Sequence, residues 1–235
     1  MTDEDPGAVG KVATAAAELF GDRLPLAEHF AAALRERGAM LGLVGPRELD
    51  RLWERHLLNC ALGTDLVAPH SSVADVGSGA GFPGVVMAIR RPDLRLTLIE
   101  SMGRRATWLD DLTGELGLTN VQIRRARAEE LRDLPAADVV TARAVAPLRR
   151  LLGWTWPLCR PGGRVLAFKG ALAEREIGEA QDWLRRAGVR DVAVETLADG
   201  EPWSARIVVV RRPHDATPPT SGRVGKARRR RTSRE

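Results

Sequence analysis

One stretch of ten residues limits the folds open to this chain more than any other. Residues 75–84 read Asp-Val-Gly-Ser-Gly-Ala-Gly-Phe-Pro-Gly and begin inside the apolar segment 72–76. Glycines at alternate positions let a backbone turn tightly and come close to a ligand, and proline suits the first turn of a helix. The stretch therefore predicts a strand, a ligand-binding turn and a helix in succession.

The residues after this turn repeat the same order. Candidate strands with apolar or alternating patterns cover 72–76, 94–100, 121–123, 138–141 and 164–168. Segments of helical period lie at 83–91, 103–116, 147–159 and 173–187. This alternation favours an α/β fold with a mostly parallel sheet and helices on both faces. Segments 192–197 and 205–210 follow without a helix between them, so an antiparallel hairpin is expected to close the sheet.

The chain before the first strand has a different pattern. Apolar residues recur at helical spacing up to Gly38, and a second helix is predicted from Pro46 to about Gly63. We therefore expect a helical N-terminal extension over 1–70, a sheet domain over 71–212 and a basic, disordered tail over 213–235.

The positive charge of the chain belongs to that tail. The net charge is +5, whereas residues 211–235 hold nine Arg or Lys and two acids, a net of +7, which leaves −2 (5 minus 7) elsewhere. Two cysteines, an acidic N-terminus and short apolar runs argue against a disulfide framework, a secretory signal and a membrane span. We expect a cytoplasmic monomer with no membrane partner.

Two cofactors compete for the glycine loop. Read from Gly79, its spacing fits the dinucleotide fingerprint, but the strand ends at Val76 and the glycines begin at Gly77. Read from Gly77, the loop follows an acid, Asp75, which would repel a pyrophosphate. The ammonium and sulfonium groups of S-adenosylmethionine suit that acid, which favours a class I methyltransferase over a dehydrogenase. The loop residues expected at the cofactor are Asp75, Gly77, Ser78, Gly79 and Gly81.

Glu100 ends the second predicted strand, 23 residues after Gly77. An acid there accepts hydrogen bonds from ribose hydroxyls in either cofactor family, so Glu100 predicts a ribose without choosing between them. Pro161-Gly162-Gly163 predicts a turn before the strand at 164–168, and such a turn is typical of class I methyltransferases.

Several motifs together resemble one family, the bacterial 16S rRNA guanine-N7 methyltransferases, also called glucose-inhibited division protein B. The loop 75–84 shares that family's Phe-Pro-Gly ending, which generic methyltransferases lack. Further similar stretches are Arg55-His56 and residues 100–105, 127–130, 141–144 and 168–170. The resemblance runs from about residue 40 to 210. The chain departs from the family pattern with Gly-Leu-Val at 42–44 and Asn-Cys at 59–60.

The resemblance implies transfer of a methyl group from S-adenosylmethionine to N7 of a guanine in the 530 loop of 16S rRNA, guanine 527. It implies 16S rRNA or the small ribosomal subunit as partner. It also implies a cofactor pocket lined by Gly77, Phe82, Ala128, Glu129 and Arg143, with Ala128 and Glu129 by the adenine. Two alternatives remain: methylation of another RNA position or a small molecule, and a non-catalytic RNA-binding assembly factor.

The expected chemistry needs little from the protein. Guanine N7 carries a free lone pair and the sulfonium activates the methyl group, so in-line positioning suffices. We therefore expect no catalytic residue and no metal, with Arg143 as the best candidate for an orienting group. Arg143 should not bind N7 itself, because N7 must stay free to react.

Basic residues at the same sheet edge and in the tail are candidates for RNA contact through phosphates. They are Arg104, Arg105, Lys169, Lys226, Arg228 and Arg229. His56 lies among apolar positions of a predicted helix, which favours a structural histidine. Cys159 is expected to pack at a helix end rather than to act as a nucleophile.

Overall fold

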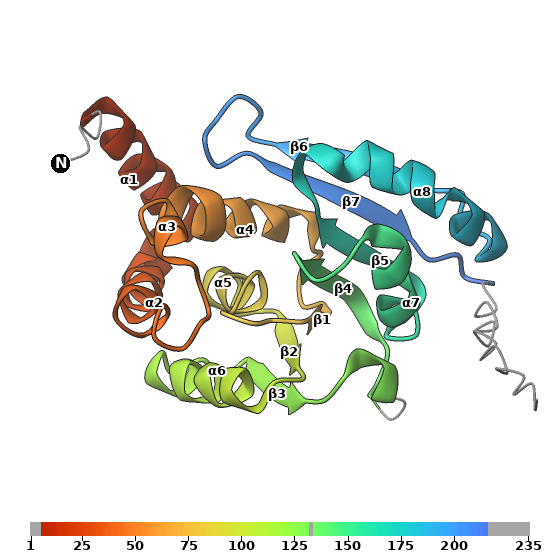
Figure 1. The fold of residues 1–235 in the computed structure, drawn as a ribbon, viewed down its shortest axis with the longest axis horizontal. Coiled ribbons are helices and arrows are strands. Elements are labelled where there is room, and N and C mark those ends of the chain that lie inside the picture. The colour runs from red at the N-terminus through yellow and green to blue at the C-terminus, as the bar shows by residue number, and fades with distance from the viewer. Residues whose placement is uncertain (1–5, 132–133, 216–235) are drawn as a thin grey trace, which may run out of the picture.

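A seven-stranded sheet forms the centre of the molecule in the computed structural model, which describes residues 6–131 and 134–215. The strands run in the order β3-β2-β1-β4-β5-β7-β6 (Figure 1). Their bounds are β1 Ser72–Val76, β2 Arg95–Glu100, β3 Val121–Arg125, β4 Ala137–Arg143, β5 Cys159–Phe168, β6 Val192–Leu197 and β7 Ala205–Arg211. All pairs from β3 to β5 are parallel, and β7 pairs antiparallel with both β5 and β6. The predicted mostly parallel sheet with an antiparallel closing hairpin is confirmed.

Helices cover both faces of this sheet, because successive strand residues alternate between two cores. Leu96 and Leu166 belong to the core under the N-terminal helices, α5 and α6, whereas Val140 and Val165 belong to the core under α7 and α8. The helices of the sheet domain are α5 Gly84–Arg90, α6 Gly103–Glu115, α7 Leu148–Thr155 and α8 Ala173–Arg186. Figure 1 shows the N-terminal helices beside α5, on the opposite side of the sheet from α7.

The strand order creates the place for a site. β1 lies between β2 and β4, so the connections after β1 and β4 leave the sheet toward opposite faces. Open parallel sheets bind ligands at such a point, beyond the carboxyl ends of the strands. The glycine loop after β1, Glu100 at the end of β2 and Arg143 at the end of β4 all reach this edge.

The N-terminal region is helical, as predicted, but its second helix is not continuous. The elements are α1 Pro6–Phe20, a 3₁₀ turn Gly21–Arg23, α2 Leu24–Arg37, α3 Pro46–Leu49, a π-helical segment Trp53–Leu58, α4 Asn59–Leu62 and a 3₁₀ turn Gly63–Leu66. The prediction of one continuous helix from Pro46 to Gly63 is therefore wrong. Leu57, Leu58, Cys60 and Ala61 are all fully buried. Their spacing fits one face of a helix, so burial is not what breaks it. The Arg143 guanidinium from β4 donates to the carbonyl oxygens of Arg55 and His56, and this contact competes with the regular helical hydrogen bonds of the segment.

Three further expectations fail near β5. The predicted helix over 147–159 ends at Thr155, and Cys159 is a buried residue of β5 rather than of a helix end. The predicted turn at 161–163 lies inside the strand, where the pairing of β4 with β5 shifts register between Ala137 and Val139. The reason is a neighbouring segment: Gly162 N donates to Arg212 O at 2.9 Å, and Arg212 N donates to Gly163 O at 2.8 Å.

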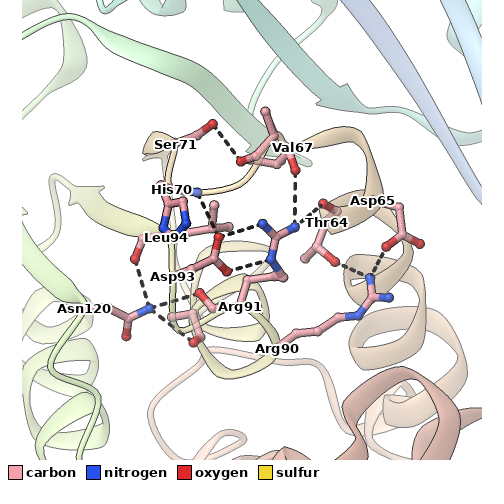
Figure 2. A network of polar contacts seen from close by, with 12 residues as sticks. Thr64, Asp65, Val67, His70, Ser71, Arg90, Arg91, Asp93, Leu94 and Asn120 are labelled. Atoms are coloured by element: carbon pink, nitrogen blue, oxygen red, sulfur yellow. Dashed lines mark hydrogen bonds and ion pairs between the residues drawn. The ribbon is translucent and has the colours of Figure 1, made fainter.

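A polar network ties the end of the N-terminal region to the turn between α5 and β2 (Figure 2). Both carboxylate oxygens of Asp93 accept hydrogen bonds from the Arg91 guanidinium at 2.7 Å, and Asp93 Oδ2 also accepts from His70 N at 2.8 Å. Arg91 Nη1 donates in turn to Val67 O at 3.2 Å. These bonds hold the pKa of Asp93 well below its usual range.

Asp93→Ala is expected to lower the free energy of unfolding by about 1–3 kcal/mol, because it leaves Arg91 and His70 N without their acceptor. Since folding depresses the pKa of Asp93, its stabilisation is complete above the unfolded-state pKa and is lost as the pH falls. Urea unfolding at pH 7 and pH 4 should therefore separate the variant from the wild type more at pH 7. Asp110→Ala, on the exposed face of α6, is the control; an equal loss there would contradict the assignment.

Candidate functional site

The glycine loop needs its glycines for both conformation and space. Gly77, Gly79 and Gly81 have φ of 73°, 54° and 114°, a region that side chains with a Cβ rarely adopt. A Cβ on Gly77 would lie 2.8 Å from Val145 Cγ2, and one on Gly81 would lie 2.9 Å from Val85 Cγ2. The loop therefore passes close to the segment after β4, where a side chain would fill the space.

Asp75, at the start of the loop, is hydrogen-bonded to its end at Gly84. Its side chain is fully buried, and its Oδ2 accepts a hydrogen bond from Gly84 N at 3.1 Å. Its Oδ1 is buried without a partner among the described residues. Burial raises the pKa of Asp75 to about 7. Asp75 thus links the two ends of the loop, and the unpartnered oxygen fits a site that takes a cationic ligand; its direct contact with the cofactor stays a prediction.

Asp75→Asn is expected to make stability less dependent on pH. The folded protein holds the Asp75 proton up to about pH 7, whereas an unfolded Asp loses it near pH 4. The wild type should therefore lose unfolding free energy as the pH rises from about 4 to 7, by at most about 1.4 kcal/mol per pH unit. Urea titrations of the free protein at pH 5 and pH 7 measure this, and a wild-type slope equal to that of Asp75→Asn would refute it.

Glu100 is also buried, with 4% of its surface exposed. Its Oε2 accepts from Gly79 N at 3.0 Å, and its Oε1 accepts from Met102 N at 2.8 Å, just before α6 begins. The carboxylate therefore holds the glycine loop against the end of β2. The predicted contact with ribose hydroxyls stays a prediction.

A cavity of about 230 Å³ opens beside the loop. Gly77, Ala128 and Glu129, three of the predicted cofactor residues, line it. The other predicted cofactor residues are not among its lining residues: Asp75, Ser78, Gly79, Gly81, Phe82, Glu100 and Arg143. Residues outside the predicted set complete the wall: Val76, Ile99, Ser101, Ala126, Arg127, Val145, Arg150 and Trp154. Ser101 and Arg127 follow strand ends and could have been found from that position, whereas Arg150 and Trp154 come from α7 and carry no motif.

Arg143 joins three parts of the fold. Its guanidinium carbon lies 5.7 Å from the centre of the Phe82 ring in the glycine loop. Its Nη1 donates to Cys60 Sγ at 2.9 Å, and its Nη2 donates to the carbonyl oxygen of Arg55. Arg143 thereby ties the end of β4 to the loop and to the N-terminal region. Cys60 was not predicted to take part, because nothing near it in the chain indicates this partner.

A second cavity, of about 680 Å³, lies beyond Arg143 and shares Val145 with the first. Four cationic side chains line it: Arg55, Arg143, Lys169 and Arg206. Among the described residues, Glu176 is the one acid in its wall. Arg55 and Arg206 also pair with acids outside the wall, Glu48 and Glu174, whereas Arg143 has no acid partner among the described residues. The cavity therefore keeps a net positive charge, which suits a ligand that carries negative charge, such as a nucleotide.

The predicted RNA-contacting residues divide into three groups. Lys169 lines the second cavity but is 92% buried as a side chain, with its Nζ 2.8 Å from Glu176 Oε2. Arg104 and Arg105 open α6 and lie by the turn at Gly42, to which Arg105 Nη2 donates at 3.4 Å. The tail residues Lys226, Arg228 and Arg229 lie outside the described residues. RNA contact stays a prediction for all six.

The fold is that of the class I S-adenosylmethionine-dependent methyltransferases. A solved structure with the same fold is the apo form of the S-adenosylmethionine-dependent methyltransferase SibL, with a TM-score of 0.56 and 22% identity. That match covers 74% of this chain and 61% of the other.

The chain belongs to the rRNA small subunit methyltransferase G family, whose model matches residues 23–205. A ribosomal RNA small subunit methyltransferase G from Thermobifida fusca is 53% identical over 73% of this chain and 73% of its own length. One from a Nocardioides species is 51% identical over 84% of this chain and 79% of its own length. The resemblance noted in the sequence is thus confirmed. S-adenosylmethionine is the cofactor of this enzyme class.

None of the helices in the described part of the chain has the length and apolar character that a membrane span needs.

Proposed function

We propose that this enzyme transfers a methyl group from S-adenosylmethionine to N7 of a guanine in the 530 loop of 16S rRNA, guanine 527. The observation that carries the proposal is the pair of adjoining cavities. The smaller one lies along the glycine loop, and the larger one is lined by cations and meets it at Val145. A flipped-out nucleotide in the larger cavity would bring its base toward the cofactor site.

The residues of the chain bind and orient, and none has to move a proton. When bound, S-adenosylmethionine would supply a methyl group activated by its positively charged sulfur, and the carbon–sulfur bond would break as the N7 lone pair bonds to the carbon. Gly77 leaves room for a ligand along the loop, while Ala128 and Glu129, which line the same cavity, would hold the adenine. Arg143 lines the larger cavity two residues before Val145, which both cavities share, and its remaining hydrogen-bonding capacity orients the target nucleotide. Well-aligned reactants gain about 7–11 kcal/mol from such positioning.

The cationic wall also indicates the partner. Arg55 and Arg206 line the larger cavity beside Arg143, and arginine is well suited to phosphate oxygens. The proposed partner is 16S rRNA, free or within the small ribosomal subunit, in the cytoplasm. The tail would add contacts with phosphates that weaken steeply with salt.

The proposal is tested with methyl-labelled S-adenosylmethionine and 30S subunits that lack N7 methylation. Parallel reactions contain naked 16S rRNA and fully methylated subunits. The expected result is label in a single guanine of the 530 loop, with none in methylated subunits. Label in another nucleotide would show that the enzyme methylates a position other than guanine 527. If S-adenosylmethionine binds but no RNA is labelled, the assignment to rRNA is refuted.

A further inference from the structure

Three side chains from distant parts of the chain form a stack at the edge of the site. The His56 ring lies 4.9 Å from the Phe82 ring at an interplanar angle of 29°. The Arg143 guanidinium contacts the same Phe82 ring, and Phe30 packs against it at 5.4 Å. Phe82 belongs to the glycine loop and Arg143 lines the larger cavity, so the stack connects the two halves of the site.

His56 is held in this stack by one polar partner. Its Nε2 lies 3.0 Å from Glu48 Oε2, while its Nδ1 is buried without a partner among the described residues. Burial and the positive charge of Arg143 lower the pKa of His56 to about 4, although Glu48 opposes the shift and Arg55 adds to it. The ring is therefore neutral at pH 7. Its Nε2–H donates to the Glu48 carboxylate, and its Nδ1 carries only a lone pair.

The π-helical segment Trp53–Leu58 contacts both Phe82 and Arg143. Its His56 side chain reaches Phe82, while the carbonyl oxygens of Arg55 and His56 face the Arg143 guanidinium, with His56 O 3.5 Å from Nη1. Single π turns inside helices are often found at functional sites. Here the turn lets one short segment touch the glycine loop and the end of β4 together.

We propose that His56, held by Glu48, is a positioning residue for methyl transfer: its ring fixes Phe82 and, through Phe82 and the adjoining carbonyls, the direction of the Arg143 guanidinium. The proposal rests on the proposed function, because Arg143 is taken to orient the target nucleotide. His56 touches neither cavity. A displacement of about 1 Å in an orienting group can lower a rate about 10²-fold, so a residue of this kind affects catalysis without contacting substrate.

The kinetic test separates the ring from its hydrogen bond. His56→Gln keeps a donor for Glu48 but loses the ring, and should lower kcat about tenfold or more with a smaller change in the Kd of S-adenosylmethionine. His56→Phe keeps a ring over Phe82 and should recover most of kcat. Leu57→Val trims a fully buried neighbour in the same segment and should leave kcat within about twofold, even if Tm falls. Equal losses of kcat in His56→Gln and Leu57→Val, or none in His56→Gln, would overturn the proposal.

A second readout needs no methyl transfer and so distinguishes failure of this proposal from failure of the proposed function. An Arg143 Nη–H signal in NMR spectra, assigned by its absence in Arg143→Lys, should be resolved and slow to exchange in the wild type, because Nη1 and Nη2 donate to Cys60 Sγ and to the carbonyl oxygen of Arg55. It should broaden or vanish in His56→Gln and persist in His56→Phe and Leu57→Val. A signal unchanged in His56→Gln would refute the positioning role even if the wild type methylates rRNA. If no RNA is methylated, the same loss of signal would still show that His56 orders Arg143.

Discussion

Arg143→Ala is expected to lower kcat/KM for rRNA methylation about 10²-fold or more. The substitution removes the cation that borders both the Phe82 ring and the larger cavity, and it leaves Cys60 Sγ and the carbonyl oxygen of Arg55 without their donor. The target nucleotide should then be less well oriented, and the N-terminal region should be held less firmly against the sheet edge. Initial rates at saturating cofactor, with the subunit concentration varied, measure the effect.

Arg143→Lys tests whether charge alone explains this loss. A lysine keeps the positive charge, but one ammonium group cannot reproduce the planar fork of an arginine that binds two acceptors. We therefore expect most of the loss to remain in Arg143→Lys. Full activity in Arg143→Lys would show that Arg143 acts through its positive charge alone and not through the geometry of its guanidinium. Activity of Arg143→Ala within about fivefold of the wild type would contradict the orienting role.

Glu100→Gln is expected to raise the Kd of S-adenosylmethionine about 10²-fold. The buried Glu100 carboxylate accepts one backbone N–H at each oxygen, from Gly79 and from Met102. An amide of the same shape turns one oxygen into an NH₂ group, which opposes one of these donors instead of accepting from it. Hydrogen bonds to charged groups contribute about 1.5–3 kcal/mol, and a loss near the upper end of that range corresponds to a change in Kd of about 10²-fold.

Isothermal titration of S-adenosylmethionine into the wild type and Glu100→Gln measures this change. Glu195→Gln makes the same chemical substitution at an exposed position of β6 and should leave the Kd unchanged. A fall in Tm alone, with the Kd of Glu100→Gln within about threefold of the wild type, would show that Glu100 only supports the fold.

Much of the fold could be predicted because its signals are local. The alternation of strand and helix patterns indicated the parallel sheet, and the absence of a helix between 197 and 205 indicated the antiparallel hairpin. The glycine loop was found from its spacing alone, since residues with a Cβ rarely adopt φ values such as the 73° of Gly77. The family followed from the same motifs.

The partners of the site side chains could not be predicted in this way. Arg143 was placed at the correct sheet edge, but its contact with Cys60 spans 83 positions in the chain. Lys169 was expected to be available for phosphate, yet the fold brings it against Glu176 from α8. In each case the pattern around the residue describes its own element and carries no information on the element packed against it.

The sequence by itself therefore determined the sheet, the loop and the enzyme family, because hydrophobic period and glycine spacing act within a few residues of one another. Tertiary structure alone decided three things: the break in the helix predicted from Pro46 to Gly63, the stack of His56, Phe82 and Arg143, and the two adjoining cavities. The physical reason is that these features arise where surfaces distant in the chain meet, and their packing overrides the preference of each segment for a regular helix or a free side chain.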